Sequence, residues 1–313
     1  MKRFQTLIGM IVSFTLMTLI SGCGGGGTSS TPTGTLSLSM TDAPPKLEGN
    51  VTAVNIAVIG IEYNYEGNWV NAEEFEPKTF NLLDLQNGKS LHLGDLVLPA
   101  GHYKEIRFKL AIPTKDTPAE IQSNPDCNIT IDNVSYPLFT PSGAETQSGY
   151  KGKGAFDITA DAKIAVTADF DIHKAIVVTG SSTKNTKYIL KPVIRLVVTE
   201  LSGMINGTVV DADAEKYASS SLVVYSYKSG EYNSDETVAD ENGSIFLNSV
   251  SAADVNMTDG NFTLAFLGEG NYSLITAEYL GDVFHGVVDQ EDNVEVLTGE
   301  VTPVDINTSD NTI

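Results

Sequence analysis

The sequence predicts an all-β protein built from two antiparallel β-sandwich domains in tandem. Two segments alternate strictly between apolar and polar residues, KEIRFKL at residues 104–110 and KIAVTADFDIHK at residues 163–174. Successive side chains of a strand point to opposite faces, so this period of two is typical of strands with one buried face. Short strands separated by polar turns favour a sandwich or barrel, and no helical periodicity of useful length follows residue 22.

The N-terminus predicts an export signal that ends at a lipidated cysteine. Two basic residues precede an almost wholly apolar stretch at residues 7–20, which is the pattern of a secretory signal peptide. Residues 20–23 (ISGC) resemble the lipobox of bacterial lipoproteins. The resemblance implies that residues 1–22 are removed and that Cys23 becomes the acylated first residue. The alternative is an uncleaved membrane anchor, because about 17–25 apolar residues span a bilayer.

The residues that follow Cys23 favour a flexible tether and an outer-membrane location. Residues 24–33 read GGGGTSSTPT, and ten residues of such Gly/Ser-rich chain span roughly 17–19 Å on average. Gly24 stands where an aspartate acts as an inner-membrane retention signal in many Gram-negative bacteria. We therefore expect residues 23–33 to hold an exported protein at the bacterial membrane, and at the outer membrane in particular.

The two parts of the chain differ in charge, and the overall acidic excess argues against a nucleic-acid partner. The formal net charge is −21; residues 23–203 hold 15 basic and 20 acidic residues, whereas residues 204–313 hold 2 basic and 20 acidic residues. A strongly acidic surface repels nucleic acid, so we expect no nucleic-acid partner. The shift in charge predicts two independently folding domains at residues 34–200 and 203–307, with a tail at residues 308–313.

A series of motifs in the first domain carries a family resemblance. In chain order they are TDAP (41–44), LLDL (82–85), LPAGHYKEIR (98–107), PSG (141–143), DFD (169–171) and YILKPVIR (188–195). This order resembles the domain-of-unknown-function family 4382 of exported bacterial and archaeal lipoproteins. The resemblance implies a β-rich exported domain with no assigned chemistry.

The second domain resembles carboxypeptidase regulatory-like (prealbumin-like) modules over residues 203–307. The motifs are a G-x-I-x-G-x-V strand at residues 203–209, DGNFTL at 259–264 and LGEGNYSL at 267–274. The last of these shares the pattern L-x-x-G-x-Y with LPAGHY at residues 98–103. We expect both copies to make the same turn, in which the glycine supplies freedom in φ and the tyrosine begins the next strand.

No catalytic signature is present, so we expect a non-catalytic protein. The four histidines are scattered, and the chain has no phosphate loop, G-x-S-x-G or H-E-x-x-H pattern. Cys127 has no disulfide partner once Cys23 is acylated, and we interpret it as structural. The leading interpretation is a non-catalytic, membrane-anchored envelope or cell-surface lipoprotein that acts as a binding, adhesion or structural module for a partner protein or matrix polymer. The alternatives are a carbohydrate-binding lipoprotein and an enzyme of unrecognised type.

Four aspartates predict a weak Ca²⁺ site. Asp169 and Asp171 lie two residues apart on a predicted strand, so their carboxylates share a face and repel each other unless a cation or a basic side chain lies between them. Asp42 and Asp84 of the family motifs contribute if the fold brings them close. Ca²⁺ takes about six to eight oxygen ligands, and extracellular sites for it are often weak. The alternative is an exposed polar face neutralised by Lys174, Lys191 or water.

Three aromatic residues predict a sugar-stacking strip. They lie in IEYNYEGNWV at residues 61–70, where Tyr63 and Tyr65 share a strand face and Trp69 follows a short turn. Exposed aromatic rings side by side suit a pyranose ring. The alternative is that these rings cover the end of a hairpin.

Overall fold

Both alternating segments form strands; the first buries one face, as the sequence predicts, whereas the second is buried on both faces from Val166 to Asp171, so that its predicted outward face is not exposed. β6 (Gly101–Leu110) buries Ile106 and Phe108, and β10 (Lys163–Asp171) buries Phe170 among its apolar residues. The charged residues between them point away from this core. A strand with one-sided burial, such as β6, needs a second layer, and the rest of the chain supplies it.

The computed structural model describes residues 31–43, 50–112, 126–139, 149–179, 187–191, 193–210, 217, 219–240, 244–281 and 283–308. We call the described part of residues 31–201 the N-terminal region and that of residues 202–308 the C-terminal region. Besides β6 and β10, the N-terminal region contains β1 (Thr33–Ala43), β2 (Val51–Tyr65), β3 (Asn68–Asn71), β4 (Lys78–Asn81), the 3-10 helix η1 (Leu82–Leu85), β5 (Leu91–Pro99), β7 (Asn128–Ile131), β8 (Val134–Phe139), β9 (Tyr150–Ile158), α2 (Ile172–Ala175), β11 (Ile176–Thr179), β12 (Lys187–Leu190), β13 (Ile194–Val198) and η2 (Thr199–Leu201).

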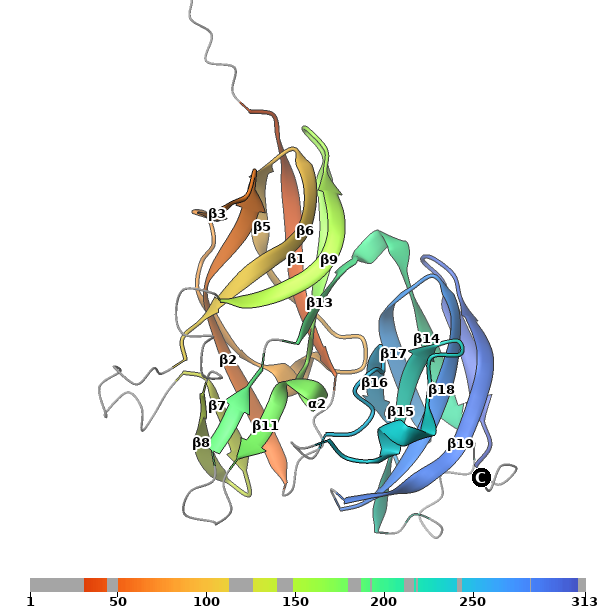
Figure 1. The fold of residues 1–313 in the computed structure, drawn as a ribbon. Coiled ribbons are helices and arrows are strands. Elements are labelled where there is room, and N and C mark those ends of the chain that lie inside the picture. Colours follow the sequence, from red (N-terminus) through yellow and green to blue (C-terminus); the bar gives the residue numbers. More distant parts are fainter. Residues whose placement is uncertain are drawn as a thin grey trace, which may run out of the picture. The chain divides into compact units, whose positions relative to one another are not determined.

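The strands of the N-terminal region form one continuous hydrogen-bonded sheet that encloses a single core (Figure 1). Its order is β11-β12-β8-β7-β2-β6-β9-β13-β10-β1-β5, and β3 and β4 pair with β2. β1 runs parallel to β10 with Asp42 opposite Phe170 and Thr41 opposite Asp169. This register places the TDAP and DFD motifs at the same end of the sheet.

Two glycines allow β9 to pass close to β13. A Cβ atom on Gly152 would lie 2.8 Å from Leu196 Cδ2, and one on Gly154 would lie 2.1 Å from the carbonyl oxygen of Leu196. Gly154 also has φ +155°, a conformation that side chains disfavour. The two strands pair in parallel there, with Ile194 opposite Gly152. Gly152 and Gly154 of the GYKGKG segment therefore allow β9 and β13 to lie this close together.

The C-terminal region is a sandwich of two sheets. Its elements are β14 (Ser202–Val209), β15 (Ser220–Lys228), the 3-10 helix η3 (Ser234–Thr237), β16 (Ser251–Asp254), β17 (Asn261–Gly268), β18 (Gly270–Leu280), β19 (Val283–Val296) and β20 (Val301–Ile306). One sheet has the order β17-β14-β20 and the other β16-β15-β18-β19. Side chains from both sheets, Ile205, Leu222, Leu264 and Leu274 among them, form the core between them.

The four-stranded sheet is buried on its second face as well. Tyr225 and Tyr279 lie on that face with their hydroxyl groups 2.6 Å apart, and Phe246 stacks on Tyr225 at 4.2 Å between ring centroids. Strands buried on both faces show continuous apolar runs instead of alternation. This two-sided burial explains why SLVVYSY in β15 lacks the period of two.

The repeated L-x-x-G-x-Y pattern joins two strands in both regions, as the sequence predicts, and its tyrosine makes the same hydrogen bond twice, which the sequence did not predict. Tyr103 donates its hydroxyl hydrogen bond to the carbonyl of Pro99 at 2.7 Å, and Tyr272 donates to Gly268 at 2.6 Å. In both cases the chain leaves one strand (β5, β17) and enters another (β6, β18) that does not pair with it. This is the arrangement of a tyrosine corner between layers of a sandwich. Of the two pattern glycines, only Gly270 has a positive φ.

Removing either tyrosine hydroxyl is expected to destabilise the protein by about 1 kcal/mol, the usual net contribution of such a hydrogen bond. Tyr103→Phe and Tyr272→Phe should therefore each lower the free energy of unfolding measured in denaturant. Tyr65→Phe is the matched control, because no hydrogen bond of the Tyr65 hydroxyl occurs among the described residues. Equal losses in all three variants would show that the corners contribute nothing specific.

The all-β class is confirmed. Antiparallel pairings predominate in the described residues, and four parallel pairings join them: β1 with β10, β8 with β12, β9 with β13 and β14 with β20. A turn with positive φ at Asp132 and Asn133 joins β7 to β8 within CNITIDNVSYPL at residues 127–138. Independent folding of residues 34–200 and 203–307 stays a prediction.

Candidate functional site

The predicted lipidation site, Cys23, lies outside the described residues, as do the signal peptide and most of the tether. Within the described residues, no helix is long and apolar enough to cross a membrane. Lipidation of Cys23 therefore stays a prediction.

The two aspartates of the DFD motif share one face of β10, and each pairs with a basic side chain. Asp169 Oδ2 accepts a hydrogen bond from Arg195 on the neighbouring β13 at 2.6 Å. Asp171 Oδ2 lies 2.7 Å from Lys174 Nζ on α2. Both carboxylates are largely buried, with only 6% of the Asp169 side chain and 11% of the Asp171 side chain exposed. The repulsion expected between them is therefore relieved by two cations of the chain itself.

The same two cations also contact the backbone of the C-terminal region. Arg195 donates from its second terminal nitrogen to the carbonyl oxygen of Phe266 at 3.0 Å, and Lys174 donates to the carbonyl oxygen of Ser249. His173, which precedes Lys174 on α2, has its Nε2 atom 3.3 Å from the carbonyl oxygen of Ile245. We call the Arg195 and Lys174 contacts the two cation bridges, because each joins a buried carboxylate of the N-terminal region to a carbonyl group of the C-terminal region.

Burial dominates the electrostatics of this cluster. It raises the pKa of Asp169 above its usual value, while the Arg195 guanidinium opposes that rise and the neighbouring Asp171 adds to it. Desolvation raises the free energy of the charged Asp169 carboxylate. The attraction of the Arg195 guanidinium offsets part of that cost. A buried charge of this kind depends on its partner far more than a surface charge does.

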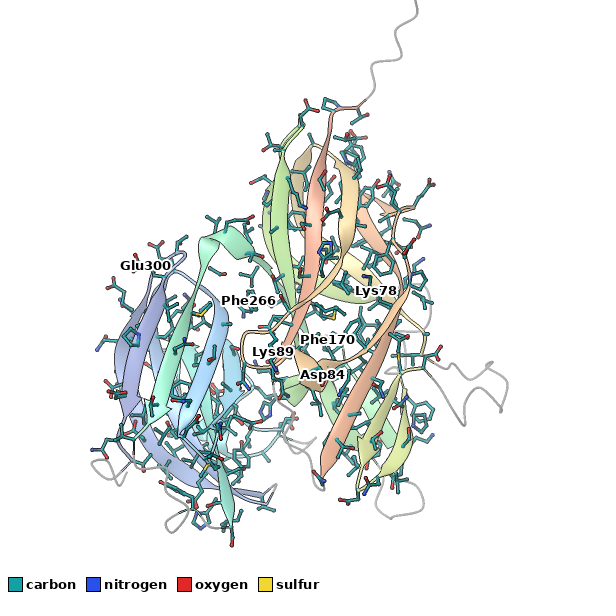
Figure 2. The ribbon with its side chains drawn as sticks, turned by 180° about the vertical axis from the view of Figure 1, so that it is seen from behind. Lys78, Asp84, Lys89, Phe170, Phe266 and Glu300 are labelled. Carbon is teal, nitrogen blue, oxygen red and sulfur yellow. The ribbon has the colours of Figure 1, made fainter. Side chains whose placement is uncertain are left out.

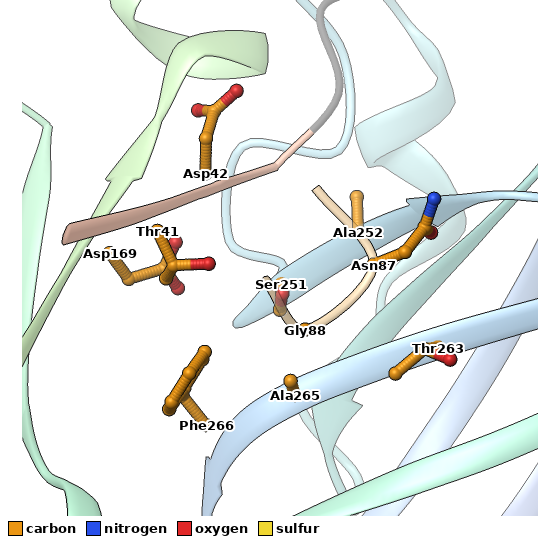
Figure 3. Close-up of a pocket in the computed structure, with 10 residues that line it drawn as sticks. All are labelled: Thr41, Asp42, Asn87, Gly88, Asp169, Ser251, Ala252, Thr263, Ala265 and Phe266. Carbon is orange, nitrogen blue, oxygen red and sulfur yellow. The ribbon is translucent and has the colours of Figure 1, made fainter. Parts of the chain in front are cut away.

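A small cavity lies beside Asp169 (Figure 3). Thr41 and Gly88 line it from the N-terminal region, and Ser251 and Phe266 line it from the C-terminal region. Its volume of ≈ 10 Å³ is about the room that one water molecule needs. The cavity is therefore too small for an organic ligand.

The other two predicted ligands, Asp42 and Asp84, do not join Asp169 and Asp171 on that face. Asp42 lies on the other side of β1 from Thr41 and Asp169 (Figure 3), where its Oδ1 accepts a hydrogen bond from the backbone of Ile172 at 3.2 Å. Asp84 is exposed on η1 (Figure 2). The structure thus places Asp169 and Asp171 on one face, while Asp42, which lines the same small cavity as Asp169, is turned toward the backbone of Ile172.

Calcium binding by these aspartates stays a prediction. Among the described residues, no group of three or more His, Cys, Asp or Glu side chains is placed to hold a metal ion. A Ca²⁺ ion at Asp169 and Asp171 would have to displace Arg195 and Lys174. The prediction requires that excess Ca²⁺ raise the unfolding temperature relative to chelator, and that the Asp169→Asn/Asp171→Asn variant lose this rise.

The aromatic residues lie on two faces of the β2–β3 hairpin. Asn64 is opposite Trp69 and Tyr63 is opposite Val70, and directly opposed residues share a face. Tyr63 and Tyr65 therefore share one face, as expected, and Trp69 lies on the other. Tyr63 is buried and Tyr65 is partly buried against the core. Sugar binding by all three together stays a prediction.

Trp69 has partners that the sequence did not indicate. The guanidinium carbon of Arg107 lies 3.6 Å from the indole centroid, and Lys151 Nζ lies 5.4 Å from it. Arg107 comes from β6 and Lys151 from β9, where they are register partners. The polar half of the KEIRFKL alternation is the signal that points to this face, but pairing of β6 with β9 is needed to assemble it.

Cys127 is a buried thiol in the N-terminal core, as the structural interpretation expects. Its side chain is inaccessible to solvent, and its sulfur accepts a hydrogen bond from the backbone of Ala57 at 3.3 Å. Burial raises the pKa of the thiol to about 12. Because the thiolate is the reactive form, Cys127 is unreactive at neutral pH.

Comparison with known proteins identifies distant structural likenesses. No curated protein matches the sequence. Among solved structures, the chain is similar to the Bacillus anthracis TIE protein (16% identity, 87% of this chain and 34% of that chain covered, TM-score 0.20), so it spans about a third of that protein. It is also similar to GBS52, the minor pilin of Streptococcus agalactiae (8% identity, 87% and 94% covered, TM-score 0.22). A third likeness is to the shaft pilin SpaA of Lactobacillus rhamnosus GG (11% identity, 89% and 97% covered, TM-score 0.20). With TM-scores this low, these likenesses carry no argument about function.

A family match covers just over half of the chain. Residues 33–192 match the family described as Domain of unknown function (DUF4382). The matched range contains the DFD motif and most of YILKPVIR, whose last residue, Arg195, completes the ion pair with Asp169. The chain therefore belongs to the DUF4382 family.

Proposed function

We propose that this protein is a non-catalytic lipoprotein of the bacterial envelope, held at the membrane by Cys23, whose two β regions act together as a binding and display module. The observation that carries the proposal is the pair of cation bridges, Asp169–Arg195–Phe266 and Asp171–Lys174–Ser249. Such contacts fix the orientation of two β regions without building a reaction centre.

The energetics of the bridges support a structural role. Hydrogen bonds to charged groups contribute about 1.5–3 kcal/mol each, and both carboxylates involved are largely buried. Regions that share only exposed polar contacts move relative to each other by default. Buried, charge-assisted bridges favour one orientation, which suits a module that presents a surface at a distance from the membrane.

The sequence supplies the other parts of the proposal. The lipobox-like ISGC and the Gly/Ser-rich residues 24–33 give an anchor and a tether, and Gly24 favours the outer membrane. The C-terminal region is proposed to be the prealbumin-like module, which its sandwich of three- and four-stranded sheets supports. The excess of acidic residues keeps that module soluble outside the cell.

Replacing Cys23 is expected to release the protein from the membrane. Cys23→Ser removes the thiol that carries the lipid, so the variant should appear in the soluble fraction or accumulate unprocessed. Cell fractionation measures the release, and mass spectrometry of the N-terminal peptide measures the acyl chains on Cys23. Cys127→Ala is the matched control, because it removes the other cysteine of the chain. Wild-type protein without acyl chains would contradict the anchoring proposal.

A further inference from the structure

The outer face of β2, β3, β6 and β9 gathers basic side chains around one indole ring. Glu62 on β2 is the register partner of Arg107 on β6, which is in turn the partner of Lys151 on β9. We call this surface the basic–aromatic face. It consists of Glu62, Trp69, Glu105, Arg107, Lys109, Lys151 and Lys153.

The indole of Trp69 covers the Arg107 guanidinium. The guanidinium carbon lies 3.6 Å from the ring centroid, and only 15% of the Arg107 side chain is exposed, whereas Trp69 is partly exposed. The Arg107 cation therefore covers one side of the ring, Lys151 Nζ lies 5.4 Å from its centroid, and part of the indole stays exposed. A cation stacked on an indole holds the ring flat and in place.

The lysines around the Trp69 ring retain hydrogen-bond donors for a ligand. Lys109 pairs with Glu62 at 2.5 Å and Lys151 with Glu105 at 3.0 Å, with 34% and 39% of the two lysine side chains exposed. Lys153 is exposed beside them. Each ammonium group has three donors, so a lysine that pairs with one carboxylate still has donors for a ligand.

The charge of this face is opposite to that of the chain. Four basic and two acidic side chains give the face a local excess of positive charge in a chain of net charge −21. The surrounding negative charge repels polyanions of high charge density such as nucleic acid. A ligand for this face must therefore carry spaced negative charges and a flat apolar surface for the indole.

We propose that the basic–aromatic face binds an acidic polysaccharide with one carboxylate per sugar unit. The C–H groups on one side of a pyranose ring pack on the exposed part of the Trp69 indole, and the sugar carboxylates accept hydrogen bonds from Lys151 and Lys153. This inference rests on the proposed display function and names the ligand class of that module. An acidic polypeptide would satisfy the lysines but would leave the indole without a matching surface.

Titration with a uronic-acid oligosaccharide tests the proposal. The probe is an oligogalacturonate of defined length, and its methyl-esterified form, which keeps the sugar rings and loses the charge, is the matched control ligand. We expect the mature full-length protein, purified with its anchor in mild detergent, to bind the charged form by isothermal titration calorimetry. Binding should weaken as salt is added, because exposed charges are screened. Equal binding of both forms, or of neither, would overturn the proposal.

Two variants and one control locate the binding. Trp69→Ala and Lys151→Gln/Lys153→Gln should each weaken binding by about tenfold or more. Lys163→Gln should leave it unchanged, because Lys163 is exposed on β10 and pairs with Asp95 at 2.8 Å instead. If Trp69→Ala impairs folding, the Lys151→Gln/Lys153→Gln variant still tests the proposal, because the replaced side chains lie at the surface.

One alternative occupant has a distinct signature. Sedimentation velocity without any sugar would show concentration-dependent association if the acidic C-terminal region of a second copy occupies this face. Such association, abolished by Lys151→Gln/Lys153→Gln and without oligogalacturonate binding, would overturn the proposal. Failure of the sugar proposal would leave membrane anchoring by Cys23 intact, so the two failures are distinguishable.

Discussion

Replacing Arg195 with glutamine is expected to destabilise the protein by about 3–5 kcal/mol, because it leaves a buried carboxylate without its cation. Asp169 has only 6% of its side chain exposed, so water replaces the guanidinium only poorly. The Arg195→Gln variant also loses the hydrogen bond to the Phe266 carbonyl. Denaturant unfolding followed by circular dichroism measures the loss.

Two controls separate this effect from a general loss of charge. Lys163→Gln breaks an ion pair with Asp95 in which 57% and 45% of the two side chains are exposed, and it should cost at most about 1 kcal/mol. The double variant Asp169→Asn/Arg195→Gln should be more stable than Arg195→Gln, since no charge is then left unpaired. If Arg195→Gln lowers the free energy of unfolding no more than Lys163→Gln does, the Asp169–Arg195 ion pair does not hold the two β regions together.

The deficit of Arg195→Gln should shrink at low pH. Burial raises the folded-state pKa of Asp169, and Arg195 opposes that rise, so removing Arg195 raises the pKa further. A folded state that binds its proton more tightly gains stability below the unfolded pKa of about 4 and loses it as the pH rises through the folded pKa. The difference between wild type and variant should therefore be largest at neutral pH and smallest near pH 4.

Replacing Gly154 with alanine is expected to cost at least about 3 kcal/mol, the combined result of a disfavoured φ and a backbone clash. The added Cβ would lie 2.1 Å from the carbonyl oxygen of Leu196, and Gly154 has φ +155°. Because the obstacle is backbone, rotation of a side chain cannot relieve it. Thermal unfolding and denaturant titration measure the loss.

Gly67→Ala separates the two causes. Gly67 also has a positive φ, +84°, but a Cβ atom there would meet nothing within 4 Å. This control therefore reports the cost of the backbone conformation alone, and Gly154→Ala should exceed it by the cost of the clash. Equal losses at the two positions would contradict the close passage of β9 over β13.

The sequence predicts the strands best where one face meets a core and the other meets water. β6 satisfies this condition, whereas β10 alternates in sequence but is buried on both faces from Val166 to Asp171. β15 does not satisfy it either, because Tyr225 and its neighbours are buried on the second face of the sheet by residues that follow in the same region. Parallel pairings such as β1 with β10 also leave no local signal, because they join segments more than 120 positions apart.

The candidate sites show the same limit. Asp169 and Asp171 read as the polar face of a strand, and they are buried because Ser249 and Phe266, about 80 to 100 positions later, contact their cations. Trp69 reads as a neighbour of Tyr63 in the sequence, but hairpin register places it on the other face, over Arg107. The segments that meet in the fold determine both sites. The alternation of apolar and polar residues does not specify which segments meet.

A distance measurement between the two β regions tests the central claim that the cation bridges fix their orientation. Nitroxide labels are placed at Ser135→Cys on β8 and Asp305→Cys on β20, both exposed positions, in the Cys23→Ser background. Cys127 is buried and stays unlabelled. Double electron–electron resonance should give one narrow distance distribution for this protein and a broad one after Lys174→Gln/Arg195→Gln. A broad distribution before the bridges are removed, or a narrow one that persists after their removal, would contradict the claim.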